Sequence, residues 1–325
     1  MKYVGIQTQK RRNNARSLFL LILFPCLVAG LIYLGCFLFF LVGYYQGADL
    51  AFDQVIVYTN LWFQQALPYA IGGVLLWFII AYFSNVRIIE NATDSHPLER
   101  KENKRVYNLV ENLCMANGMQ MPQINVIEDD SLNAFASGIN KKTFTVTLTT
   151  GTIKYLDDAE LEAVIAHELT HIRNNDVKLM IVSIVFVGIF SVLAQLGFQV
   201  LRSSMHTSSS RKNEKGGGVI LIVIIVLVVA TIGYLFSALM RFAISRNREY
   251  MADAGSAEMT KHPEALASAL RKISLDPRVE AIERKDVAQL FIEDPKEKGL
   301  TASNLFGLFS THPPIQKRIA VLEQF

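Results

Sequence analysis

Cysteine is scarce in this 325-residue chain, which contains only Cys26, Cys36 and Cys114. The three form no CxxC pair, so the sequence excludes a disulfide framework and a cysteine-rich metal site. We expect small, buried apolar thiols in a mainly cytosolic, reducing environment. A strong excess of one charge is also lacking, because the net charge is only +3. The sequence therefore indicates no nucleic-acid partner.

Charge is also absent from residues 17–43, an apolar run long enough to cross about 30 Å of hydrocarbon. Similar runs at 66–83, 177–199 and 218–240 predict three further transmembrane helices, the second beginning around Pro68. A cleaved signal peptide is the alternative for the first run. That run exceeds the usual signal length, however, and no clear small-x-small cleavage site follows it. The chain is therefore expected to be a multi-pass membrane protein in a lipid bilayer.

Lysine and arginine are missing from the connection 44–65, whereas both flanking polar segments are rich in them. The positive-inside rule therefore places the N-terminus and everything after residue 84 in the cytoplasm. The loop 200–217 disagrees, since it is basic although a full hairpin over 177–240 would put it outside. A shallow or tilted insertion of this segment is the alternative. The basic residues of the N-terminal tail are Lys2, Lys10, Arg11, Arg12 and Arg16.

The polar segments predict an α+β fold that is mainly helical. Residues 84–176 should contain both classes of element, with a turn at Gly138–Lys141 and a helix cap at Asp157 or Asp158. Residues 241–325 should be mainly helical. The expected helices are 97–117, 158–174, 242–258, 263–274 and 312–323, and the expected strands are 122–128, 132–137 and 143–149.

The string His167-Glu168-Leu169-Thr170-His171 carries the strongest chemical signal. Residues four apart share one helical face, so both imidazoles can bind one metal ion while Glu168 reaches a water on it. Zinc suits these ligands and lowers the pKa of its water toward 7. Glu168 would accept that water's proton, and hydroxide would attack a peptide carbonyl. The alternative is a surface helix with two ordinary histidines.

A third ligand must come from elsewhere, and the acidic pair Glu249 and Asp253 provides candidates. These residues are four apart and would project from one helical face, although such a pair is usually just solvated. Glu249 is predicted to bind the metal, and Asp253 to hold a ligating histidine in its tautomer. The sequence thus predicts one Zn²⁺ per subunit, held by His167, His171 and Glu249.

This ligand set also constrains the topology. The two histidines precede the third apolar run and Glu249 follows the fourth, so residues 177–240 must cross the membrane an even number of times or not at all. The expected order is a cytosolic tail (1–16), two transmembrane helices with a short external loop (17–83), the first part of a catalytic domain (84–176), a transmembrane hairpin (177–240) and the second catalytic part (241–325).

The order of these motifs resembles the HtpX-type heat-shock membrane endopeptidases, relatives of the zinc CAAX prenyl proteases. The resemblance covers nearly the whole chain: two N-terminal spans, Leu132–Gly138, the His–Glu–His helix, Glu249–Asp253 and Thr311–Pro314. It implies a gluzincin-like metallopeptidase domain on the cytosolic side of the bacterial inner membrane. It also implies proteolytic quality control under stress, with misfolded or damaged membrane proteins and unfolded polypeptides as substrates.

The resemblance further implies roles that the sequence chemistry does not suggest. The strand containing Asn133, Ala134, Phe135 and Ala136 would be an edge that receives substrate by strand addition, with an ordinary buried strand as the alternative. His312 would stabilise the oxyanion and act as a catalytic residue, although a histidine before proline is usually a loop residue. Arg318 would anchor nearby carboxylates. The role of Asp176 is left open: it is either a helix-end group or a partner of the metal ligands.

Two other functions compete with quality control. A zinc peptidase with a dedicated substrate, such as a prenyl-protein processor, is one, but four spans provide too few helices for a large intramembrane chamber. A catalytically dead membrane scaffold is the other, and the intact His–Glu–His–Glu set argues against it.

Overall fold

The computed structural model describes residues 6–45, 51–179, 215–275 and 313–325, with isolated positions between 181 and 202. The chain divides into two compact units. The first is formed by Met1–Ser17, Tyr82–Ile184 and Met240–Phe325, and it contains the His–Glu–His string and the acidic pair Glu249 and Asp253. The second is formed by Leu18–Ala81 and Val185–Leu239, and it contains most of the apolar sequence.

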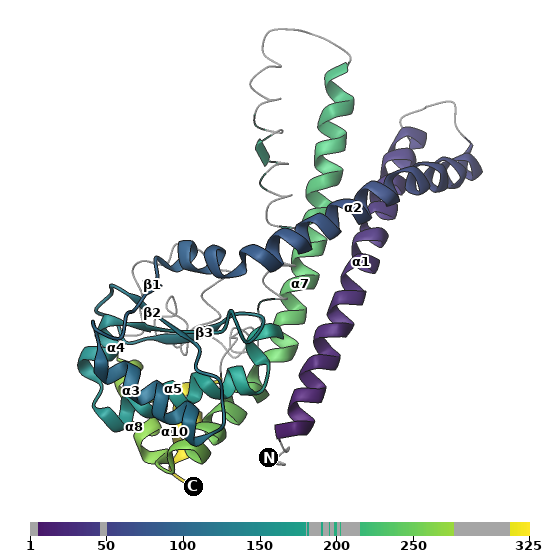
Figure 1. Cartoon of the computed structure of the whole chain (residues 1–325). Helices are drawn as coiled ribbons and strands as arrows, with labels where there is room; N and C mark the ends of the chain where they lie inside the picture. Colours follow the sequence, from purple (N-terminus) through teal and green to yellow (C-terminus); the bar gives the residue numbers. More distant parts are fainter. Residues whose placement is uncertain are drawn as a thin grey trace. The chain divides into compact units, whose positions relative to one another are not determined.

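Two long helices open the chain, α1 (Ile6–Tyr45) and α2 (Phe52–Thr93) (Figure 1). Within them, the stretches Ile22–Tyr45 and Phe52–Ser84 are each long and apolar enough to cross a membrane. Their surfaces expose many large apolar side chains, among them Leu75 and Ile79. Such exposure disfavours an aqueous environment for these helices and suits a lipid one.

The second apolar stretch differs from the prediction. Helix α2 is already helical from Phe52, and its candidate span, Phe52–Ser84, begins before Pro68. Polar residues such as Asn60 dilute the hydropathy of this first part, but they do not break the helix. Ring contacts between α1 and α2, including Phe39 with Trp62 and Phe40 with Tyr58, hold the two helices together here.

The other two apolar runs are described less completely. The run 177–199 lies outside the described residues except for a few positions. The run 218–240 is part of α7 (Lys215–Thr260), whose apolar part is Val223–Leu235 among the residues described. Loop 200–217 is almost wholly outside that part of the chain. The number of membrane crossings, and with it the hairpin, stays a prediction.

A four-stranded sheet with the order β1-β2-β4-β3 forms the core of the first unit. Strand β2 (Gln123–Ile127) pairs in parallel with β4 (Thr145–Thr149), so that Ile124 lies opposite Val146. The short β1 (His96–Pro97) and β3 (Ala134–Ser137) flank them in antiparallel pairings. The three predicted strands are confirmed with slightly shorter bounds, and β1 is an addition.

The predicted turn between β3 and β4 is also confirmed. Gly138 has φ +106°, and a Cβ there would lie 2.2 Å from the carbonyl oxygen of Thr143. Only glycine tolerates both conditions, so its position fixes the register of the hairpin. The Thr143 amide closes the turn by donating to the Asn140 carbonyl over 3.0 Å.

Helices cover one face of this sheet, and in Figure 1 they gather below the strands. The central helix is α5 (Asp158–Arg173), which contacts β3, β4, α3 and α8, while α8 also packs on α10. Helices α5, α8 and α10 match predicted helices within three residues at each end, whereas the helix predicted over 97–117 begins only at Lys104, and the short α4 was not predicted. The bounds of the others are α3 (Lys104–Ala116), α4 (Thr150–Tyr155), α8 (Pro263–Ile273) and α10 (Ile315–Leu322).

Candidate metal centre

Helix α5, which carries the His–Glu–His string, begins at a complete capping box. The Asp157 side chain accepts from the Glu160 amide over 2.9 Å, and the Glu160 side chain accepts from the Asp157 amide over 3.0 Å. These bonds satisfy amides that a helix N-terminus otherwise leaves without partners. Glu160 also accepts from Ser268 and Lys272 of α8, at 2.7 and 2.6 Å. The start of α5 is therefore held both locally and by its neighbour.

Helix α5 is buried nearly all round, since twelve of its sixteen residues are buried. The buried set includes His167, Glu168 and His171, each at most 5% exposed. Polar groups withdrawn from water in this way need compensating partners. A surface helix with two ordinary histidines is therefore excluded.

The Nε2 atoms of His167 and His171 lie 3.2 Å apart, as expected for side chains one helical turn apart that point to one centre. The Glu249 carboxylate faces both: Oε2 is 3.7 Å from Nε2 of His167, and Oε1 is 3.6 Å from Nε2 of His171. Two ligand atoms at about 2.1 Å from a tetrahedral ion are separated by about 3.4 Å. The three side chains therefore fit a metal ion of that size with only small adjustments.

Close packing of α7 on α5 brings Glu249 to this place. The Ser256 hydroxyl donates to the Ala163 carbonyl over 2.7 Å, and Gly255 lies directly against Thr170. A Cβ on Gly255 would lie 2.3 Å from Cγ2 of Thr170, so the two helices approach more closely than any larger residue allows. This contact fixes the distance between α7 and α5, and with it the position of the acidic residues of α7.

Each histidine also has a carboxylate on its outer nitrogen. Nδ1 of His167 lies 3.1 Å from Oδ1 of Asp253, and Nδ1 of His171 lies 3.0 Å from Oδ2 of Asp176. A carboxylate in this position favours a proton on Nδ1 and leaves Nε2 as the metal ligand. The predicted Asp253 contact is present, and Asp176, which the sequence left open, is its counterpart on the second histidine.

Two buried arginines from distant segments accompany these carboxylates. Arg318 of α10 donates from Nε and Nη2 to the two oxygens of Asp253 over 3.0 and 2.7 Å, and its Nη1 lies 3.5 Å from Glu249. Arg248 donates from Nη1 to the Asp176 carbonyl over 3.4 Å. Arg318 was predicted to anchor carboxylates and its geometry fits. Arg248 was missed, because one arginine beside an acidic pair carries no signal of burial.

The electrostatics of the centre follow from burial and these contacts. Burial disfavours the charged imidazole of His167, but hydrogen bonds with Asp253 and Glu249 outweigh it and raise the pKa to about 9. Burial likewise opposes the Asp253 carboxylate, yet Arg318 and His167 hold its pKa below the ordinary value. The centre thus concentrates negative potential where a cation would sit.

Glu168 differs from the other carboxylates. Burial raises its pKa above the ordinary value, while the neighbouring His167 and His171 partly counter that shift. A carboxylate with a raised pKa is a stronger base, which suits the acceptance of a proton from water.

Two other predicted features, His312 and the edge strand, have different outcomes. His312 lies outside the described residues. Strand β3 is an edge of the sheet within the described chain, as predicted, because its pairing is with β4. Its residues are nevertheless almost fully buried, with Phe135 at 0% exposure, and so is the preceding Asn133.

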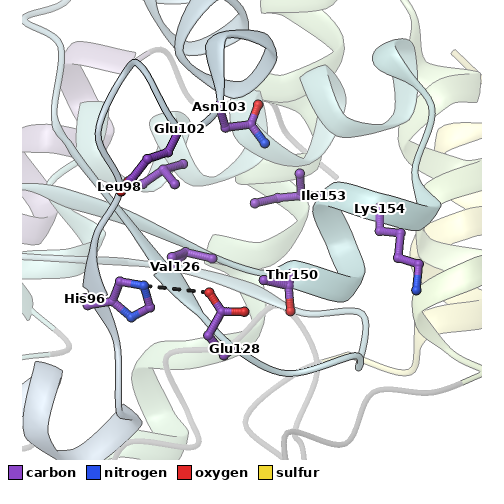
Figure 2. Close-up of a pocket in the computed structure, with 9 residues that line it drawn as sticks. All are labelled: His96, Leu98, Glu102, Asn103, Val126, Glu128, Thr150, Ile153 and Lys154. Carbon is purple, nitrogen blue, oxygen red and sulfur yellow. Dashed lines mark ion pairs between the residues drawn. The ribbon is translucent and has the colours of Figure 1, made fainter.

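A separate concave region of about 280 Å³ lies elsewhere in the first unit (Figure 2). Its lining includes Val126, Ile153 and an ion pair of 3.7 Å between His96 and Glu128. Both of these side chains are more than half exposed. None of its lining residues belongs to the buried cluster on α5, so the metal centre is the stronger candidate for chemistry.

Comparison with known proteins agrees with this centre. Residues 100–325 match the model of peptidase family M48. A protease HtpX homolog of Bacteroides fragilis is 64% identical over 326 residues and covers 100% of both chains. A protease HtpX homolog of Dictyoglomus turgidum is 38% identical over 256 residues, which are 76% of this chain and 80% of that one.

Among solved structures, S. mikatae Ste24p matches with a TM-score of 0.45 and 20% identity, over 80% of this chain and 64% of that one. A likeness of this size does not bear on activity, and the family is shown by the sequence matches. Since the family model spans more than half of the chain and a full-length relative is 64% identical, the protein belongs to peptidase family M48 and is an HtpX-type metalloprotease.

Proposed function

We propose that the protein is a zinc-dependent endopeptidase that cleaves misfolded or damaged membrane proteins as part of proteolytic quality control under stress. The observation that carries this proposal is the convergence of His167, His171 and Glu249 beside the buried Glu168. The ligand atoms of the first three all lie within 4.8 Å of one another. Two imidazoles and one carboxylate form a donor set that suits zinc and leaves a fourth position open.

In this proposal one Zn²⁺ per subunit is bound by His167, His171 and Glu249. When bound, zinc supplies the Lewis acidity that makes water a nucleophile at neutral pH. Glu168 accepts the proton of the attacking water and then delivers it to the departing amine. Asp253 and Asp176 keep the imidazoles in the orientation that ligation requires.

Strand β3 is proposed as the substrate platform. In an antiparallel pair, alternate backbone groups face away from the partner strand, so β3 can accept a further extended strand along Asn133–Ala136. Main-chain pairing of this kind is independent of side chains, which suits an enzyme that receives many unfolded segments. Because β3 is buried, a substrate must first displace whatever covers this edge.

His312 and Arg318 complete the proposed machinery. His312 would stabilise the oxyanion, a role consistent with its place three residues before α10. Arg318, also on α10, pairs with Asp253 and so connects this helix to the metal centre. The two residues lie six apart in sequence, which brings the oxyanion donor and the carboxylate anchor from one segment.

The proposed location is the bacterial inner membrane, with several spans and a cytoplasmic catalytic domain. The two apolar helices and the positive residues that flank them support this arrangement. Labelling tests the hairpin at its loop: a Ser208→Cys variant should react with an impermeant thiol reagent only from outside the cell. Exclusive cytosolic labelling would contradict a full hairpin.

Metal analysis combined with cleavage of casein or a destabilised membrane protein tests the central proposal. Wild type should contain about one zinc per chain and cleave both substrates. Glu168→Gln should retain the zinc and lose cleavage, because the amide keeps the size of the carboxylate but cannot accept the proton. Activity that survives this change would refute the assigned base, and a metal other than zinc would refute the cofactor.

A further inference from the structure

The first turns of α1 form an exposed basic surface. Helix α1 begins at Ile6, well before its apolar part, and Arg11, Arg12 and Arg16 are exposed on it. Residues 2–16 contain five basic residues and no acidic one. No partner carboxylate is therefore available within this segment to neutralise the three arginines.

The position of this basic surface along α1 indicates what it meets. Arg16 precedes the apolar stretch Ile22–Tyr45 on the same unbroken helix. Six residues of helix correspond to about 9 Å, so the arginines stand about where the headgroups begin when that stretch is in hydrocarbon. Arginines at this depth attract anionic lipid headgroups.

The same segment contacts the end of the catalytic helix. The Asn175 side-chain amide donates to Oδ1 of Asn14 over 3.2 Å. Asn175 has φ +60° and lies in the tight turn that follows α5. The next residue is Asp176, which contacts Nδ1 of His171. The contact with α1 and the partner of the metal ligand are therefore on adjacent residues.

We propose that anionic phospholipid headgroups bind the surface formed by Arg11, Arg12 and Arg16, and that this binding raises proteolytic activity through the Asn14–Asn175 contact. The inference rests on the proposed peptidase function and adds a regulator to it. Charge complementarity and continuity with the apolar part of α1 favour lipid as the occupant. Free phosphate shares the chemistry but lacks the anchoring chains that hold lipid beside this helix.

The test uses the full-length protein, reconstituted in vesicles of phosphatidylcholine alone or with added phosphatidylglycerol. Retention of spin-labelled phosphatidylglycerol and kcat/KM for casein are measured on the same samples. Each basic residue near a bilayer contributes about fivefold to such binding. We therefore expect the variant with Arg11→Gln, Arg12→Gln and Arg16→Gln to lose at least fivefold in lipid retention and to lose the activation.

The Asn14→Ala variant distinguishes lipid binding by the three arginines from transmission of that binding through the Asn14–Asn175 contact. It should retain phosphatidylglycerol like wild type, because its charges are intact, but should no longer be activated by it. The matched control removes three exposed lysines elsewhere, with Lys101→Gln, Lys142→Gln and Lys154→Gln. This control should behave like wild type in both measurements.

Several outcomes would overturn the inference. Equal wild-type activity in both vesicles, or full activation of Asn14→Ala, contradicts the connection. Activation by inorganic phosphate in phosphatidylcholine vesicles contradicts lipid as the occupant. If the triple variant does not insert correctly, the activities of wild type and Asn14→Ala in the two kinds of vesicle still test the inference. If no sample cleaves casein, the peptidase assignment has failed, while lipid retention still tests the basic surface.

Discussion

Replacement of Asp253 by asparagine tests the organisation of the metal centre most directly. Asp253 is 1% exposed, receives two hydrogen bonds from Arg318, and lies 3.1 Å from Nδ1 of His167. Asparagine keeps the shape but removes the charge. It leaves the Arg318 guanidinium buried without its closest counter-charge and removes the acceptor that orients His167.

The two consequences have different sizes. Loss of one partner of a buried ion pair costs about 3–5 kcal/mol. The value here should be near 3 kcal/mol, because Glu249 lies 3.5 Å from Arg318 and partly replaces the lost charge. Loss of a carboxylate that orients a metal-bound histidine costs 10- to 100-fold in metal affinity. Asp253→Asn should therefore lower both stability and affinity.

Chemical unfolding in detergent with a chelator present would isolate the stability of the metal-free protein, and competition with a chromogenic chelator would give zinc affinity. At pH 7 the Asp253 contribution is complete. Its folded-state pKa is lowered, so this stability is present above the unfolded value of about 3.9 and is lost only as pH falls through the lowered folded value.

Arg318→Met provides the matched control. Alone, it should destabilise the protein, yet it should reduce zinc affinity less than Asp253→Asn because the carboxylate remains beside His167. The double variant removes both charges, so its loss of stability should be smaller than the sum of the single losses. Strictly additive losses, or unchanged zinc affinity in Asp253→Asn, would refute the reasoning.

Three further predictions concern neighbouring residues. Glu249→Gln should reduce zinc affinity by at least tenfold in chelator competition, and an unchanged metal content would remove it from the ligand set. Asp176→Asn should weaken zinc binding 10- to 100-fold, as Asp253→Asn does, whereas Asp176 acting only at the helix end would leave affinity intact. Gly255→Ala should cost about 1–3 kcal/mol of unfolding free energy through its clash with Thr170. Combination with Thr170→Ala should recover most of that loss, and no recovery would exclude the clash as the cause.

The core of the site could be predicted because its signals are local. His167 and His171 are one helical turn apart, and so are Glu249 and Asp253, so helical periodicity alone places each pair on one face. The Asp157 cap was predictable for the same reason, since a capping box spans only four residues. These elements depend on neighbours in sequence. Helix α5 has the expected bounds within one residue, whereas the helix predicted over 242–258 is the end of the much longer α7.

The features that could not be predicted depend on distant contacts. The contact between Asp176 and His171 is one of them. It depends on the turn at Asn175, which follows α5 and brings the Asp176 carboxylate back to His171. Hydropathy also does not record the ring contact of Trp62, in the early part of α2, with Phe39 of α1. The two-residue β1 is shorter than any periodic pattern, and it forms only because β2 is beside it.

The separation of the two ligand pairs has a consequence for the synthesis of the enzyme. Glu249 lies on α7, roughly 80 residues after the histidines, and the most apolar part of the C-terminal half lies between them. At ribosomal rates of about 5–20 residues per second, several seconds pass between emergence of the first ligands and the last. During that interval the nascent chain contains the His–Glu–His helix but no complete centre. The metal centre of a newly made chain therefore cannot form before residue 249 has left the ribosome.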